Sequence, residues 1–93
     1  MDIQYQESKH GGVFFLEESG HRIAEITYQW KDKTTIIADH TWVDGSLRGQ
    51  GVARKMLDTL VEFARDKQLK IVATCSYVEV MFRRDKGLAD VVA

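Results

Sequence analysis

The hydrophobic pattern of the chain changes once, at Asp44-Gly45-Ser46, and this change constrains the fold more than any other feature. Before it, apolar residues recur with a period of two or in short runs, as in half-buried strands. After it, apolar residues recur at intervals of three and four, as on one face of an amphipathic helix. We therefore expect a sheet from the first half of the chain and a long helix packed against it.

Three short segments rich in polar residues and glycine divide the first half into four predicted strands. The strands cover residues 3–7, 13–17, 22–30 and 34–43, and the segments between them are His10-Gly11-Gly12, Glu18-Ser19-Gly20 and Lys31-Asp32-Lys33. Connections this short join antiparallel neighbours, so the pattern predicts a four-stranded meander.

The second half predicts a β-α-β unit. A helix over residues 50–67 is followed by a short apolar run, 69–74, which is typical of a buried strand parallel to strand 34–43. A short helix over 77–84 and a tail over 88–93 follow. The predicted fold class is mixed α/β with α+β layering, in which a mostly antiparallel sheet of about five strands belongs to a single domain, residues 1–93.

Cysteine, histidine and hydropathy exclude several classes of protein. The single cysteine, Cys75, excludes an internal disulfide framework and a zinc ribbon or finger, and it favours a reducing compartment. His10, His21 and His40 lack the spacing of metal ligands, so no metal site is predicted. No apolar run approaches the ~20 residues of a transmembrane helix, and the N-terminus lacks signal-peptide features. These features predict a cytoplasmic protein without a membrane partner.

The charge is small overall but unevenly distributed. The formal net charge of −1 gives no general reason to expect nucleic acid or an anionic membrane as a partner. Residues 1–46 carry four Lys/Arg against eight Asp/Glu, whereas residues 47–93 carry nine against six, so the halves have charges of −4 and +3. We expect a polyanionic ligand to prefer the second half.

The segment between the fourth strand and the long helix, Leu47-Arg48-Gly49-Gln50-Gly51-Val52-Ala53-Arg54, carries the chemistry. Its glycines let the backbone approach a ligand, and the first helical turn presents unpaired N–H donors at the positive end of the helix dipole. Such a place binds phosphate, and Arg48 and Arg54 add suitable charge. Taken alone, the residues leave a simple turn and helix cap as the alternative.

Two better-known phosphate loops do not fit this segment. A Walker loop needs Gly-Lys-Ser/Thr, but Val52-Ala53 follows Gly51. A dinucleotide fingerprint needs a third small residue where Arg54 stands.

The segment does resemble the Arg/Gln-x-x-Gly-x-Gly/Ala pyrophosphate loop of the GNAT superfamily of acyl-CoA N-acyltransferases. The matching residues are Arg48-Gly49-Gln50-Gly51-Val52-Ala53. The chain is most similar to the minimal, single-domain GNAT-like group, which it also resembles at His40-Thr41-x-Val43 and Cys75-Ser76-Tyr77-Val78. The resemblance covers residues 13–92.

This resemblance implies an acetyl-CoA site without a metal. The strands of the β-α-β unit would splay and admit the pantetheine arm, while the loop amides hold the pyrophosphate. Backbone groups near Trp42 and Val43 would align the arm and polarise the thioester carbonyl, and Tyr77, Phe82, Arg83 and Arg84 would lie near the far wall of the site. The expected cofactor-binding residues are Trp42, Val43, Arg48, Gly49, Gln50, Gly51, Val52, Ala53, Arg54, Phe82 and Arg83.

Acetylation of an amine needs a base for the amine proton and an acid for the departing thiolate. His40, near the end of its strand, is the expected base, because histidine titrates near neutral pH; Asp39 should point to the opposite face. Cys75 either attacks the thioester, if a neighbour such as His40 lowers its pKa, or is an inert buried thiol. Tyr77 is the expected acid, by resemblance to tyrosines used in the superfamily.

The chain departs from full-length GNAT enzymes, whose first strands are joined by two helices that shape the acceptor site. Short turns replace those helices, so the acceptor pocket is either shallow or completed by a partner. The predicted function is an acetyl-CoA-dependent N-acetyltransferase that acts on an unidentified small-molecule or protein amine, by direct attack or through an acetyl-cysteine. The alternatives are a non-catalytic acyl-CoA-binding or sensing module, and a structural interaction domain that binds no cofactor.

Overall fold

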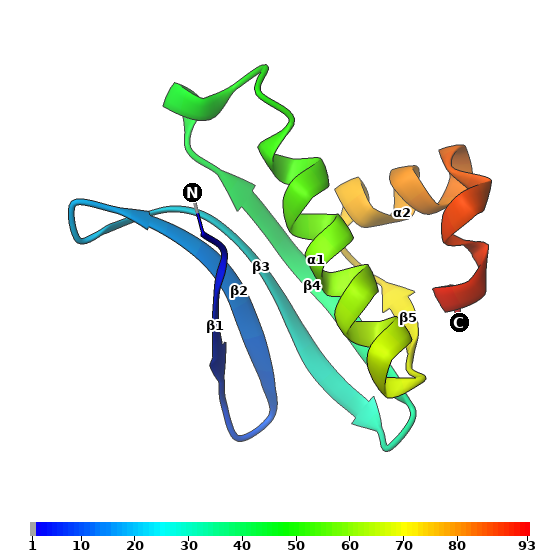
Figure 1. Cartoon of the computed structure of the whole chain (residues 1–93). Helices are drawn as coiled ribbons and strands as arrows, with labels where there is room; N and C mark the ends of the chain where they lie inside the picture. The colour runs from blue at the N-terminus through cyan, green and yellow to red at the C-terminus, as the bar shows by residue number, and fades with distance from the viewer. Residues whose placement is uncertain (1) are drawn as a thin grey trace.

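The computed structural model describes residues 2–93 and contains a five-stranded sheet with the order β1-β2-β3-β4-β5 (Figure 1). The first four strands pair antiparallel, and β4 and β5 pair parallel. The strands are β1 (Gln4–Glu7), β2 (Gly11–Glu18), β3 (His21–Asp32), β4 (Thr35–Val43) and β5 (Lys70–Ala73). This mixed sheet with its β-α-β unit confirms the predicted fold class.

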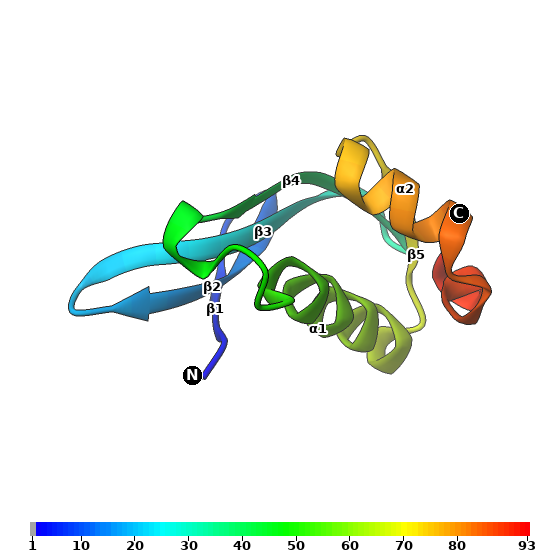
Figure 2. The same cartoon turned by 90° about the horizontal axis from the view of Figure 1, so that it is seen from above.

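Two α-helices and two 3₁₀ helices follow the meander. They are η1 (Gly45–Leu47), α1 (Val52–Lys67), α2 (Ser76–Arg84) and η2 (Lys86–Val91). Figure 2 shows α1 beneath the curved sheet, whereas no helix formed by residues 2–93 lies over β2, β3 and β4 on the opposite side. We call that opposite side the outer face of the sheet.

The core lies between α1 and the sheet. The apolar stripe predicted for α1 is buried, and it packs on residues of β2, β3 and β4 that also face inward. The buried helix residues are Val52, Met56, Leu57, Leu60, Val61 and Ala64, and their partners on these three strands include Leu16, Ala24, Ile26, Ile36 and Ala38. Burying each large side chain stabilises the fold by about 1.5–3 kcal/mol, so this contact fixes α1 on the sheet.

Gly11 and Gly12 were predicted to form a turn, and that prediction is wrong. Both belong to β2, where they pair with Gln29 and Tyr28 of β3. The turn lies just before them, where the N–H of Ser8 donates to the C=O of Gly11 at 2.9 Å. A Cβ at Gly11 would lie 1.9 Å from the carbonyl oxygen of Tyr28, so this glycine permits close approach of strands rather than a turn.

A β-bulge interrupts β4 at Asp39. The register passes from Tyr28 opposite Ala38 to Thr27 opposite His40, which leaves Asp39 without a partner residue in β3. Because a bulge of one residue reverses which face the following side chains occupy, the strand beyond it is turned over.

The consequence of the bulge is visible in the side chains on either side of it. Asp39 accepts hydrogen bonds from Thr27 and Gln29, and His40 contacts Glu25, all three of which lie on the outer face of β3. The prediction that Asp39 and His40 point to opposite faces is therefore wrong.

Candidate active site

The loop before α1 depends on glycines for its backbone shape. Gly49 and Gly51 have φ values of 82° and 70°, in the left-handed region that side chains disfavour. A Cβ added at either position would meet no atom within 4 Å, so the constraint is conformational rather than steric. Asp44 fixes the other end of the loop by accepting a hydrogen bond from the N–H of Ser46 at 3.0 Å.

The N-terminus of α1 has the features of an anion site. Gly51 is the N-cap and provides no capping side chain, and the first turn contains no acidic residue. Its first N–H groups have no acceptor within the helix, and the helix dipole makes this end positive. These donors are therefore available to a ligand oxygen.

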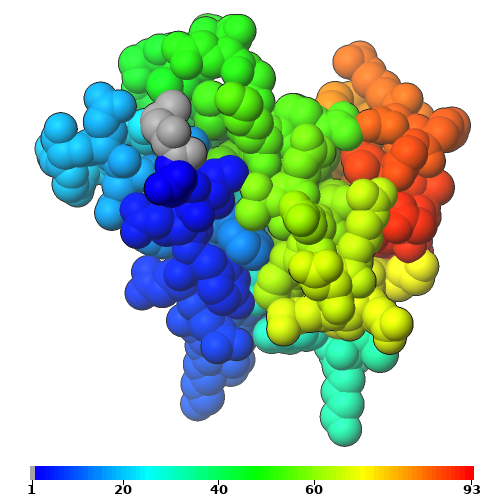
Figure 3. Space-filling view, in the orientation of Figure 1, coloured from blue at the N-terminus to red at the C-terminus, as the bar shows by residue number. Residues whose placement is uncertain are grey.

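A hollow of about 260 Å³ opens at this helix end, between the loop and α2. Figure 3 shows a notch at the top of the molecule between the green loop and the orange α2. The residues that line this loop hollow are Val43, Asp44, Leu47, Arg48, Gly49, Gly51, Val52, Ala53, Arg54 and Tyr77. The structure thus gathers most of the predicted cofactor-binding residues, although Gln50 is exposed and does not line the hollow.

Beyond the loop hollow, β4 and β5 diverge. They pair only from Thr35 opposite Lys70 to Ala38 opposite Ala73, after which the N–H groups of both Thr74 and Cys75 donate to the C=O of Ala38. Residues 39–43 of β4 lie beyond this pairing, and β5 leaves one side of them unpaired. We call that side the open edge. This divergence is the splay that the resemblance implied.

The hydrogen-bond pattern of β4 decides which backbone groups face the open edge. The N–H of Asp44 donates to Ile23 of β3 at 2.8 Å. Since successive residues of a strand direct their polar groups to alternate sides, Thr41 and Val43 direct theirs to the open edge, whereas Trp42 directs its own toward β3.

Comparison with known families decides the identity of this arrangement. The family model described as GCN5-related N-acetyl-transferase matches residues 13–91, which include the loop, the open edge and α2. The chain belongs to the GCN5-related N-acetyltransferase family.

Relatives of this N-acetyltransferase family member agree with that assignment. Protein NATD1 of Xenopus tropicalis is 30% identical over 78 residues, which are 83% of this chain and 72% of that protein. Human NATD1 is 29% identical over 83% of this chain and 69% of its own length.

Solved structures give the same fold. A solution structure of a GCN5-like putative N-acetyltransferase from Staphylococcus aureus has 35% sequence identity and a TM-score of 0.77, and the match covers 97% of this chain and 87% of that one. A GNAT-family acetyltransferase from Elizabethkingia anophelis, crystallised with acetyl-CoA bound, has a TM-score of 0.64 at 16% identity, over 81% of this chain and 52% of that one. The second comparison supports the fold alone.

Cys75 lies at the mouth of the splay in this N-acetyltransferase fold. It is the N-cap of α2, and its Sγ lies 3.3 Å from the Oγ of Thr41 across the open edge. Burial acts to raise the pKa of the thiol, but the hydrogen bond with Thr41 and the N–H groups of Val78 and Tyr77 outweigh it, so the pKa is lowered. This environment favours the thiolate, which is the nucleophilic form.

His40 does not join Cys75. Its Nε2 lies 3.1 Å from a carboxylate oxygen of Glu25, which also pairs with Arg22 at 3.1 Å. The bulge turns His40 to the outer face, so the expected neighbour of the thiol is replaced by Thr41, to which the sequence analysis gave no role beyond its place in the motif His40-Thr41-x-Val43. Nothing in the sequence pattern marks the bulge that brings Thr41 there.

The predicted residues of α2 are divided between two hollows. Tyr77 lines the loop hollow, and burial is the main reason that the pKa of its hydroxyl is raised. Phe82 and Arg83 line a different hollow beside β5, with Val92 and other residues. Five residues of helix turn a side chain by about 140°, which is why Phe82 cannot share the side of Tyr77.

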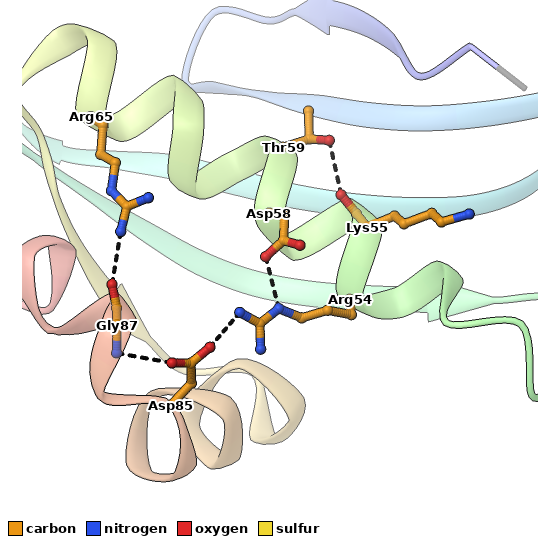
Figure 4. Close-up of polar contacts among 7 residues, drawn as sticks. All are labelled: Arg54, Lys55, Asp58, Thr59, Arg65, Asp85 and Gly87. Carbon is orange, nitrogen blue, oxygen red and sulfur yellow. Dashed lines mark hydrogen bonds and ion pairs between the residues drawn. The ribbon is translucent and has the colours of Figure 1, made fainter.

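Arg54 forms ion pairs with two carboxylates, so its charge is not free to bind a ligand at the loop. Its Nε lies 2.7 Å from Asp58 and one terminal nitrogen lies 2.5 Å from Asp85 (Figure 4). The hydrogen bonds with Asp85 and Asp58 raise the pKa of Arg54. Arg54 therefore ties the first turn of α1 to the end of α2, whereas Arg48 makes no ion pair within residues 2–93.

We expect the stability given by the Arg54–Asp85 pair to disappear in acid. The hydrogen bond from Arg54 and the N–H of Gly87 lower the pKa of Asp85, so its contribution is present above the ordinary carboxyl pKa and is lost as the pH falls through the lowered value. Asp85→Asn should melt below the wild type at pH 7, and the gap should close toward pH 3. Thermal unfolding followed by circular dichroism measures both; a gap that stays constant with pH would contradict the assignment.

Residues 2–93 contain neither a membrane-spanning helix nor a metal-binding cluster. No helix in that range is both long enough and apolar enough to cross a membrane. No three His, Cys, Asp or Glu side chains within it are placed to hold a metal ion.

Proposed function

We propose that this chain is an N-acetyltransferase that moves the acetyl group of acetyl-CoA to an amine. The observation that carries the proposal is the uncapped N-terminus of α1, which faces a hollow that is also lined by Val43, at the end of the open edge of β4. The helix end fits a pyrophosphate, and the backbone groups of Val43 and the C=O of Thr41, which face the open edge, fit the amides of a pantetheine arm. Arg48 supplies cationic charge beside the loop.

Bound acetyl-CoA would supply an acetyl group activated as a thioester. Around it, the N–H groups at the open edge would polarise a carbonyl oxygen. Tyr77, a phenol that is protonated at neutral pH and whose pKa burial raises further, would supply the proton for the departing thiolate. His40, oriented by Glu25, would accept a proton on the outer face, from which an amine can approach because no helix of the described residues covers it. On the direct route the amine would attack the thioester and release CoA as its thiolate. On the covalent route Cys75 would first take the acetyl group and release CoA, and the amine would then attack the acetyl-cysteine and release the Cys75 thiolate.

A non-catalytic acyl-CoA-binding module remains the second candidate. The bare outer face favours it, because the helices that shape the acceptor pocket in full-length GNAT enzymes have no counterpart over β2, β3 and β4 within the part of the chain that the structure describes. In that case a protein partner or nothing at all would cover the face. We propose a cytoplasmic location in either case, since a single free cysteine fits a reducing compartment better than an oxidising one.

Calorimetric titration with acetyl-CoA and with free CoA tests the cofactor. We expect saturable binding in the micromolar range, about 7 to 8 kcal/mol. Absence of binding to both would refute the acyltransferase and the binding module together, and would leave the loop as a helix cap.

Intact mass after incubation with acetyl-CoA separates the two routes. A gain of one acetyl group that Cys75→Ala abolishes identifies the covalent route. Release of CoA in the presence of a panel of amines, without that gain, identifies direct attack. Tight binding with neither result identifies the non-catalytic module.

A further inference from the structure

The contact between Thr41 and Cys75 links the end of β4 to the residues that follow β5, where these two strands have stopped pairing. Thr41 lies on β4 beyond the last β4–β5 pair, and Cys75 lies just after β5. Their Oγ and Sγ atoms are 3.3 Å apart, within hydrogen-bond range for sulfur. The bulge at Asp39 is what turns Thr41, rather than His40, toward the sulfur.

We propose that Thr41 is a positioning residue that holds the Cys75 sulfur at the open edge and donates its hydroxyl to that sulfur in the deprotonated form. The proposal rests on the proposed function only for the role of the thiol, which is to accept the acetyl group. With the thiol protonated, the S–H donates to the Thr41 oxygen, and after proton loss the direction reverses because a hydroxyl is both donor and acceptor. Thr41 and Cys75 therefore remain hydrogen-bond partners in both protonation states of the thiol.

Other donors around the sulfur also favour its deprotonated form. The backbone N–H of Thr41 acts on the thiol from the same side, and those of Tyr77 and Val78 act from the first turn of α2. These donors lower the pKa of Cys75 although burial raises it. A helix N-terminus and a hydroxyl together form a donor set suited to an anion.

The titratable side chains on the neighbouring elements have other hydrogen-bond or charge partners than the Cys75 sulfur alone. On α2, the charges of Arg54 and Asp58 of α1 affect the pKa of Tyr77, and so does the charge of Cys75. On β4, His40 pairs with Glu25 on the outer face. The hydroxyl of Thr41 is thus the side-chain group that hydrogen-bonds the sulfur.

The test is the pH profile of alkylation of the full-length protein by iodoacetamide. The chain has one cysteine, so the profile reports Cys75 alone. Thr41→Val keeps the shape and removes the hydroxyl, and we expect its midpoint to rise by about one pH unit, which is about a tenfold smaller thiolate fraction at neutral pH. Thr41→Ser restores the hydroxyl and should return the midpoint to the wild-type value.

A matched control makes the same chemical change elsewhere. Thr59→Val removes a hydroxyl that hydrogen-bonds the C=O of Lys55 on α1, and it should leave the midpoint unchanged. If Thr41→Val is poorly folded by circular dichroism, Thr41→Ala serves in its place. An unshifted midpoint in the valine or alanine variant, or a serine variant that behaves like valine, would overturn the proposal. The readout involves no acetyl-CoA, so a shifted midpoint in a protein that does not bind CoA upholds Thr41 and refutes the proposed function.

Discussion

Replacement of Gly51 by aspartate is expected to weaken CoA binding on the order of a hundredfold relative to replacement by asparagine. The two substitutions have the same shape, and both residues tolerate the left-handed conformation better than other side chains do. The position has open space, since an added Cβ meets no atom within 4 Å. The difference between the variants therefore isolates a negative charge at the N-terminus of α1.

Calorimetry on the wild type and both variants measures this effect. Asparagine should retain most of the wild-type affinity, apart from the modest strain of a φ of 70°. Equal affinities for the aspartate and asparagine variants would show that no ligand anion lies at this helix end. The pyrophosphate assignment would then be wrong even if CoA binds elsewhere.

The sequence predicted the geometry of the loop and of the α1 N-terminus well because both are local. The φ values of Gly49 and Gly51, the absence of a capping side chain and the first turn of α1 all depend on residues that are adjacent in the chain. The period of the apolar residues likewise predicted α1 to within two residues at its start. Gly51, in the left-handed region, ends the loop and delays the helix to Val52.

The catalytic candidates were predicted less well because their arrangement depends on register. One extra residue in β4, Asp39, moves His40 to the outer face and brings Thr41 to Cys75. Such a bulge shifts the phase of the alternation by one residue, but the residues beyond Asp39 do not mark the shift. The large apolar Trp42 is exposed, whereas the polar Thr41 pairs with buried Ile26, so residue order alone does not reveal the bulge. Arg54 illustrates the same limit, because its partner Asp85 is 31 positions away.

Gly11→Ala is expected to destabilise the fold by about 3 kcal/mol or more, which lowers the melting temperature by at least about 12 °C. The added methyl group would lie 1.9 Å from the C=O of Tyr28 and 2.8 Å from the Cα of Gln29, and both obstacles are backbone atoms of the paired strand β3. Backbone atoms cannot move aside as a side chain can, so β2 and β3 must separate locally. Gly45→Ala is the matched control, because a Cβ there meets nothing within 4 Å, and its melting temperature should change little.

Thermal unfolding gives the stability, and calorimetry with CoA at low temperature tests whether the damage stays local. Gly11 pairs with Gln29, at the far end of β3 from Ala24, which pairs with Val43 at the open edge. The folded fraction of the Gly11→Ala protein should therefore bind CoA with nearly wild-type affinity. A melting temperature within 3 °C of the Gly45→Ala control would mean that the strands tolerate the methyl group, and the close approach of β2 to β3 would then not be the reason for a glycine at this position.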